Sequence, residues 1–149
     1  MPPTIAIAPM MDWTDRHYRV LMRCMTQCTV LYTEMVHANA MIHGHIQTNQ
    51  PLHPSENPVV LQLGGCDPEL LSQAALIGER LGFAEINLNV GCPSPRVQSG
   101  SFGACLMKDK LLVRSCIEAL QNDKIEATLK CRLGLGKNLN YEFFEEFID

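Results

Sequence analysis

Short apolar runs alternate with helix-like stretches along the whole chain, and this alternation limits the possible folds more than any other feature of the sequence. The apolar runs have the length and composition of strands, and they lie at residues 4–8, 29–35, 58–63, 84–89 and 127–131. Helical patterns occupy residues 15–26, 67–81 and 109–120. Strands that alternate with helices in this way are typical of a parallel sheet with crossover connections. We therefore expect an α/β protein.

The helical segments carry recognisable start signals. Thr14 is the expected N-cap of the first helix, and Asp67 followed by Pro68 opens the second. Asn140 is placed to cap a last helix that begins near residue 141. The first helix would have an apolar stripe made of Val20, Leu21 and Met25.

Two architectures are built from such units, an open dinucleotide-binding sheet and a (β/α)8 barrel. No G-x-G-x-x-G motif follows the first strand, which disfavours the open sheet. A barrel needs eight strands and roughly 250 residues, whereas this chain has 149 residues and five predicted strands. We therefore expect residues 1–149 to be the truncated N-terminal part of a TIM barrel domain, without the later barrel strands.

Composition excludes several other classes. Apolar residues make up 46% of the chain, which is typical of a globular domain rather than a disordered one. No apolar run approaches the roughly 20 residues that span a bilayer, and the start of the chain has no signal-peptide pattern. The 7 cysteines are an odd number without a C-x-x-C pair, which favours reduced thiols and a cytoplasmic protein.

Polar residues occur late in several predicted strands, where a barrel interior should be apolar. They are Gln62, Asn87, Asn89 and Lys130. An unpaired buried polar group costs roughly a few kcal/mol, so such residues need a reason. Active sites of TIM barrels form where strands end, at their carboxyl side. Four polar residues at that one end indicate a ligand site, which would also include Pro9, Met10 and Met11 after the first strand and the turn at Cys92.

The chain resembles the tRNA-dihydrouridine synthases in several blocks. The segment EINLNVGCPS at residues 85–94, followed by Arg96-Val-Gln98 and FGACLM at residues 102–107, is similar to the signature of that family. Further similar blocks lie, in the family's order, at residues 8–16, 31–35, 61–65 and 129–134. The residues at 96–98 and 102–107 most resemble the A branch of the family, which acts on the tRNA D-loop at positions 20 and 20a.

The resemblance implies an FMN enzyme that is reduced by NADPH and converts uridine to dihydrouridine. In this family the reduced flavin passes a hydride to C6 of the base, and a cysteine gives a proton to C5. That cysteine would be Cys92. A free thiol has a pKa of about 8.5 and is mostly protonated at neutral pH, which suits a proton donor. The alternative for Cys92 is a buried structural thiol, which is the expectation for the other six cysteines.

The resemblance also assigns binding roles. Pro9, Met10 and Met11 would lie along the isoalloxazine ring, although such a segment is more often core. Gln62 would contact the polar edge of the ring, and Lys130 would lie near its N1–C2=O region. Asn89 would hold the uracil, with Asn87 on the same face. Arg96, in a loop with Gln98, would touch phosphate.

Other candidate residues are expected to be structural. Arg16, Arg19 and Arg23 share one helix and would form a solvated face. Cys24 and Cys28 would belong to the core. The histidines show no i,i+4 pair on a helix, so no metal site is expected.

The net charge of -4 gives no sign of a nucleic-acid partner. The resemblance places much of the tRNA surface on a C-terminal helical domain that this chain lacks. Two alternatives stay open: another FMN barrel oxidoreductase acting on a small pyrimidine or enone, and a non-catalytic fragment. The isolated chain is expected to bind FMN weakly, because the phosphate loops of such barrels follow strands seven and eight. The sequence leaves the oligomeric state open.

Overall fold

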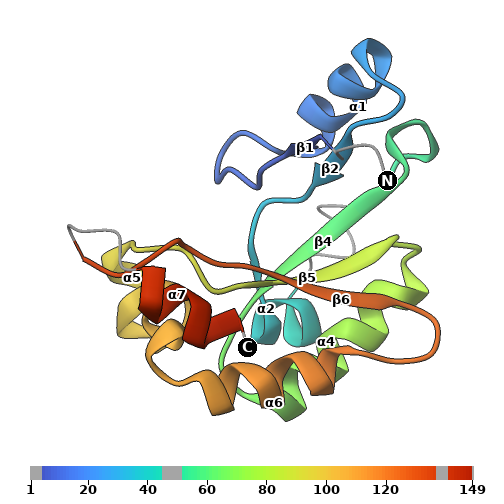
Figure 1. Ribbon diagram of the computed structural model, residues 1–149. Coiled ribbons are helices and arrows are strands. Elements are labelled where there is room, and N and C mark those ends of the chain that lie inside the picture. The colour runs from blue at the N-terminus through green and yellow to red at the C-terminus, as the bar shows by residue number, and fades with distance from the viewer. Residues whose placement is uncertain (1–4, 45–51, 137–140, 149) are drawn as a thin grey trace.

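The described part of the chain forms one parallel sheet with helices packed against it (Figure 1). The computed structural model describes residues 5–44, 52–136 and 141–148, with the backbone alone at Arg96 and Gln98. The strands are β1 (Ala6–Ile7), β2 (Val30–Tyr32), β3 (Val36–His37), β4 (Val59–Gly64), β5 (Glu85–Asn89) and β6 (Glu126–Lys130). They follow the order β1, β2, β4, β5, β6, and β3 also pairs with β4. All of these pairings are parallel.

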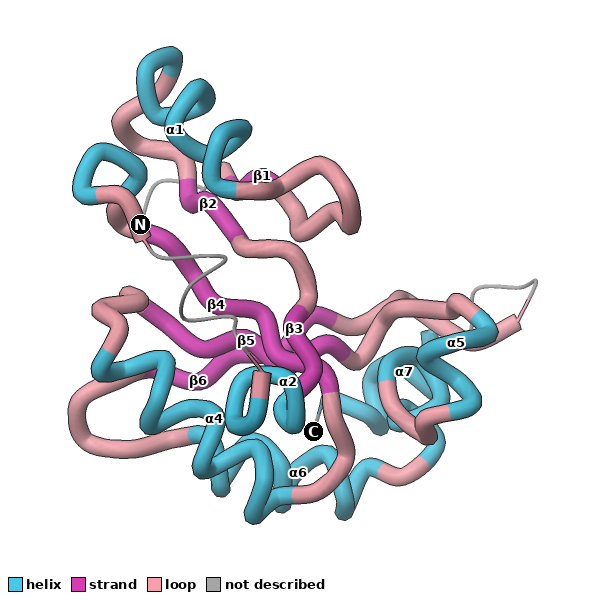
Figure 2. The backbone as a smooth tube through the Cα atoms, turned by 180° about the vertical axis from the view of Figure 1, so that it is seen from behind, coloured by secondary structure: helices cyan, strands magenta, loops and turns pink. Residues whose placement is uncertain are grey.

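Eight helical segments are described. They are α1 (Arg16–Met25), α2 (Ala38–His43), η1 (Pro54–Glu56), α4 (Pro68–Arg80), α5 (Pro95–Ser99), η2 (Gly103–Lys108), α6 (Lys110–Leu120) and α7 (Tyr141–Ile148). Among them, α2, α4 and α6 pack on one face of the curled sheet. Figures 1 and 2 show α2, α4 and α6 side by side along β4, β5 and β6, with α1 beside β1 and β2. The arrangement is a half-barrel, which confirms the expected N-terminal part of a TIM barrel.

The predicted strands at residues 58–63, 84–89 and 127–131 are confirmed to within about one residue. The predicted strand at 29–35 is too long, because β2 ends at Tyr32 and an interruption at residues 33–35 separates it from β3. At the interruption, the backbone N–H of Gln62 donates to the Thr33 hydroxyl at 3.1 Å, so a side chain replaces a backbone partner. β2 and β3 both pair with β4 and together occupy the second strand position of the barrel.

The core lies between the sheet and the helices. Leu61 and Leu63 of β4 and Ile86 and Leu88 of β5 are buried there, with exposed fractions of 1% or less. Gly78 of α4 lets the helix approach closely, since a Cβ at this position would lie 2.8 Å from the Ile86 and Leu61 side chains. Because side chains alternate along a strand, Gln62, Asn87 and Asn89 face the opposite, inner side of the half-barrel.

The first helix differs from expectation. Its N-cap is Asp15, whose side chain accepts from Tyr18 N at 2.8 Å. Thr14 is buried instead, and its hydroxyl bonds both the N–H and the carbonyl of Met10, each at 3.0 Å. The expected apolar stripe is not buried, because Leu21 and Met25 are 59% and 73% exposed.

Two arginines of α1 are structural, so the expected solvated face is wrong for them. Arg19 is fully buried, and its Nε lies 2.6 Å from Oε2 of the equally buried Glu56 in η1. Arg23 donates to backbone carbonyls, including those of Thr29 at 3.0 Å and Pro58 at 2.9 Å. These contacts fasten α1 to the segment that leads into β4.

The other helix starts agree with the sequence where they are described. Asp67 caps α4 by accepting from Glu69 N and Leu70 N, with Pro68 in the first turn. Asp109 caps α6. Asn140 lies outside the described residues. The expectation that Cys24 and Cys28 belong to the core is wrong, because both are exposed. Cys116 is buried, as expected.

Candidate active site

A cavity of about 280 Å³ opens at the carboxyl ends of β4, β5 and β6. Its lining residues are Pro9, Met11, Met35, Gln62, Asn89, Gly91, Cys92, Pro93, Lys130 and Arg132. The strand register brings the polar side chains of three strands together, because Gln62 of β4 pairs with Asn87 of β5, and Asn89 of β5 pairs with Lys130 of β6. Six of the residues singled out in the sequence therefore share one cavity: Pro9, Met11, Gln62, Asn89, Cys92 and Lys130.

Three singled-out residues are not placed in this cavity: Asn87, which lines a neighbouring cavity, Met10 and Arg96. Met10 is 40% exposed and does not line it, although its backbone is fixed by Thr14. Arg96 has a helical backbone in α5, and its side chain lies outside what the structure describes.

The turn that carries Cys92 is held from three sides. The Asn89 side-chain oxygen accepts from the backbone N–H of Gly91 at 3.2 Å and of Cys92 at 2.9 Å. The Cys92 carbonyl accepts from Ala104 N at 2.9 Å. Gly103 has a φ of +71°, and a Cβ there would lie 2.6 Å from the Cys92 carbonyl oxygen, so only glycine fits beneath the turn. The half-buried Cys92 sulfur lies 3.6 Å from the Ser94 hydroxyl.

A row of side-chain hydrogen bonds runs from this turn across the inner face of the sheet. Asn89 Nδ2 donates to Gln62 Oε1 at 2.8 Å, and Gln62 Nε2 donates to Asn87 Oδ1 at 2.7 Å. Asn87 Nδ2 donates to the Thr128 hydroxyl at 2.8 Å, and that hydroxyl donates to the Glu85 carboxylate. Each amide therefore has a fixed orientation.

These bonds decide what the amides offer to a ligand. The Asn89 oxygen already accepts two backbone N–H groups, so it has little capacity left for a base. A primary amide carries two N–H donors, and within the described residues Asn89 and Gln62 each use one of them. With the Lys130 ammonium and the Arg132 guanidinium, the cavity presents mainly donors. Its polar side therefore suits the carbonyl oxygens and ring nitrogens of an electron-rich ligand.

Sequence reasoning missed two lining residues. Arg132 follows Lys130 by two positions, and its Nη1 lies 3.3 Å from the Gly91 carbonyl oxygen. The period of two along an extended segment could have found it. Met35 follows Glu34, whose carboxylate accepts from Asp12 N at 2.5 Å and so ties the loop after β1 to the second strand position.

Two further cavities adjoin the site. One of about 520 Å³ lies deeper along the inner face and includes Pro9, Tyr32, Glu85, Asn87 and Lys130 in its lining. Burial, and next the charge of Glu85, raise the pKa of Tyr32.

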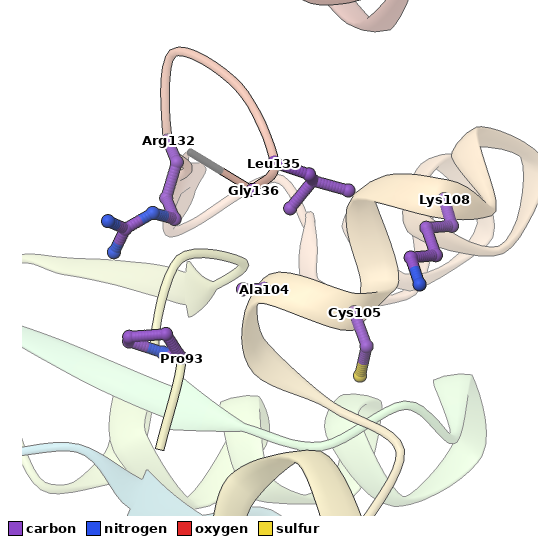
Figure 3. Close-up of a pocket in the computed structure, with 7 residues that line it drawn as sticks. All are labelled: Pro93, Ala104, Cys105, Lys108, Arg132, Leu135 and Gly136. Carbon is purple, nitrogen blue, oxygen red and sulfur yellow. The ribbon is translucent and has the colours of Figure 1, made fainter. Parts of the chain in front are cut away.

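The other cavity, of about 340 Å³, lies behind the Cys92 turn, between η2 and the segment after β6. Figure 3 shows Arg132 and Lys108 on opposite sides of it, with Cys105 on the η2 helix between them. Pro93 and Arg132 line both this cavity and the candidate site.

Burial acts on three of the other thiols. Burial raises the pKa of Cys116 to about 11 and also raises the pKa of Cys66 and Cys131. Such thiols stay protonated and unreactive at neutral pH. Among the described residues, no group of three or more His, Cys, Asp or Glu side chains could hold a metal ion. None of the described helices is both long and apolar enough to cross a membrane.

Comparison with known proteins gives a consistent result. The family model described as dihydrouridine synthase (Dus) matches residues 6–149. A tRNA-dihydrouridine(20/20a) synthase of Xanthomonas axonopodis pv. citri is 53% identical over 146 residues, which are 97% of this chain and 44% of that protein. Proteins of the same name from Synechocystis sp. and Escherichia coli O6:H1 are 51% and 50% identical, with the same shares covered.

The chain thus spans less than half the length of the curated relatives it matches. The match nevertheless runs through every strand of the half-barrel and through the Cys92 turn. This chain belongs to the dihydrouridine synthase family.

Proposed function

We propose that the chain forms part of an enzyme that reduces uridine to 5,6-dihydrouridine in the D-loop of tRNA. The observation that carries the proposal is the presence of Cys92, Asn89, Gln62 and Lys130 around one cavity at the carboxyl end of the strands. The relatives named above carry positions 20 and 20a in their names, and we propose the same positions for this enzyme. We also propose a cytoplasmic location, where its tRNA substrate is found.

The residues present fit one side of a flavin. FMN, reduced by NADPH, would supply the hydride that C6 of the base accepts. Gln62 has an amide N–H left for the polar edge of the ring, and the Lys130 ammonium would stabilise negative charge there. Pro9 and Met11 give the cavity an apolar side against which a flat ring can pack.

Cys92 would act as the acid. Reduction of the uracil C5–C6 bond needs a hydride at C6 and a proton at C5, and the thiol supplies the proton. The sulfur becomes a thiolate, which regains its proton from solvent, and the Ser94 hydroxyl at 3.6 Å can donate to it in the meantime. The second amide N–H of Asn89 is left to hold a uracil carbonyl, and Arg96 is proposed to contact phosphate.

The rest of the enzyme would supply what this chain lacks. We propose that further strands close the barrel and carry the FMN-phosphate loops, and that a helical domain contributes basic surface for tRNA. This division accounts for the net charge of -4 in the present chain, because phosphate contacts in nucleic-acid complexes come mainly from Lys and Arg.

The decisive experiment replaces Cys92 with Ala in the full-length protein. The variant should keep its flavin spectrum and lose at least about 100-fold in the rate of dihydrouridine formation, the lower range for a lost general acid. Cys105→Ala, on η2 behind the turn, is the matched control and should keep the rate. Formation of dihydrouridine at the wild-type rate by Cys92→Ala would remove Cys92 from the mechanism. Reduction of free uracil but not of tRNA would refute the tRNA substrate.

A further inference from the structure

The hydrogen bonds on the inner face of the sheet all point in one direction. Each donor lies nearer the Cys92 turn, and each acceptor lies nearer Glu85, through Asn89, Gln62, Asn87 and Thr128. The row therefore starts at backbone N–H groups, which can only donate, and ends at a carboxylate, which can only accept.

Each amide along the row has a donor end and an acceptor end and could be turned around. The Thr128 hydroxyl carries a single hydrogen, and it gives that hydrogen to Glu85. Its oxygen must then accept from Asn87, which fixes the Asn87 oxygen toward Gln62. By the same reasoning the Gln62 oxygen faces Asn89. The carboxylate at the far end of the row and the backbone N–H groups at the near end thus require the same orientation of every amide between them.

Burial makes this orientation costly to change. Gln62 is 1% exposed, Asn87 is 2% exposed, and Asn89 is 9% exposed. A reversed amide would place two acceptors or two donors face to face, where little water can reach them. The charge of Glu85 contributes to the raised pKa of Tyr32, which agrees with a carboxylate that faces the interior.

We propose that Glu85 is a positioning residue whose carboxylate sets the direction of the Asn87–Gln62–Asn89 row, and so supports the orientation in which Asn89 holds the Cys92 turn. Glu85 and Asn89 are four residues apart on β5, about 13 Å along an extended strand, so they act on each other only through the row. The consequence for catalysis rests on the proposed function, because it assumes that Cys92 and the donors beside it meet the substrate.

A test by rescue follows from the direction of the bonds. In Asn89→Asp the ionised side chain can only accept hydrogen bonds, so it cannot donate to Gln62. The Glu85 carboxylate at the other end also only accepts, so the row would have an acceptor at both ends. In the double variant Asn89→Asp, Glu85→Gln the new amide at position 85 can donate to Thr128. The whole row can then reverse, with Gln62 donating to position 89.

The measurement is the melting temperature of the full-length protein at pH 8, which favours an ionised carboxylate at position 89. Asn89→Asp should lower it by about 5 °C, the expected cost of one buried mismatch in a complete barrel domain of roughly 250 residues. Glu85→Gln alone should lower it by less, since its amide oxygen can still accept from Thr128. The double variant should recover at least half of the loss caused by Asn89→Asp.

Glu126→Gln is the matched control. Glu126 pairs with Glu85 across β5 and β6 but takes no part in the row, and it is exposed. Glu126→Gln should therefore give no recovery when combined with Asn89→Asp. If Asn89→Asp alone does not fold, folding of the double variant Asn89→Asp, Glu85→Gln would count as recovery. The double variant Asn89→Asp, Glu126→Gln should then remain unfolded.

Additive effects of Asn89→Asp and Glu85→Gln, or equal recovery by Glu126→Gln, would overturn the proposal. The experiment needs neither tRNA nor flavin. Its failure is therefore distinct from a failure of the proposed reaction, which the Cys92→Ala assay tests.

Discussion

Gly103 offers a direct way to displace the Cys92 turn without touching a residue that meets the substrate. It has a φ of +71°, and a Cβ there would lie 2.6 Å from the Cys92 carbonyl oxygen and 2.4 Å from the Val97 side chain. Ordinary contact begins at 3.4 Å. In Gly103→Ala the Cys92 carbonyl must therefore shift by roughly 0.8 Å from the new Cβ, which disturbs the hydrogen bond that it accepts from Ala104 N at 2.9 Å.

The expected loss of activity is large compared with the loss of stability. A misplacement of about 1 Å can cost on the order of 100-fold in rate, so dihydrouridine formation by the full-length Gly103→Ala protein should fall by about that factor. Forcing alanine into the left-handed region costs about 1–2 kcal/mol. The free energy of unfolding, measured in urea, should fall by this amount plus the cost of the clash.

Gly82→Ala separates the two causes. Gly82 has a φ of +85°, and a Cβ there would meet no atom within 4 Å. This variant should lose about 1–2 kcal/mol of stability from backbone strain alone and keep its activity. A Gly103→Ala protein that forms dihydrouridine within twofold of the wild-type rate would refute the argument that the turn positions Cys92.

Three further predictions concern the core, the thiols and the flavin edge. Glu56→Gln should destabilise the protein by about 3–5 kcal/mol in urea unfolding, because it leaves the buried Arg19 without its counter-ion. Glu118→Gln, in the exposed pair with Arg114, should cost less than about 1 kcal/mol. Equal costs would contradict the argument from burial. Burial raises the pKa of Cys116 to about 11 from 9.0, so as the pH rises the unfolded chain loses the thiol proton before the folded protein does. The urea midpoint should therefore fall between pH 9 and pH 11, and Cys116→Ala should reduce that fall. An unchanged dependence on pH in Cys116→Ala would show that another group is responsible. Lys130→Met should weaken FMN binding by about 10-fold in a fluorescence titration, the value of a lost charged hydrogen bond, and unaltered binding would return Lys130 to a structural role.

The strands and the meeting of the polar residues could be predicted because both depend on local pattern. A period of two places Gln62 and Asn89 on the inner face, and parallel pairing brings strand ends to one edge. Register adds what the pattern lacks: the row from Asn89 to Glu85 exists because Gln62, Asn87 and Thr128 are neighbours on three adjacent strands. No one-dimensional spacing contains that information.

Two predictions about α1 were wrong for different reasons: one residue has a partner far away in the sequence, and two adjacent residues are equally good N-caps. Arg19 is buried because Glu56, 37 residues away, reaches it. Thr14 and Asp15 are both good capping residues, and the choice falls on Asp15 because the Thr14 hydroxyl is engaged by Met10. The sequence alone offers no way to rank these contacts.

The interruption between β2 and β3 has a consequence for engineering. Glu34 lies in that gap, and its carboxylate accepts from Asp12, whose own backbone is left-handed with a φ of 64°. The loop bearing Met11 is therefore braced by the neighbouring strand position. A graft that exchanges the first rim loop for that of another barrel must carry residues 33–35 with it, or the transplanted loop will lose its brace.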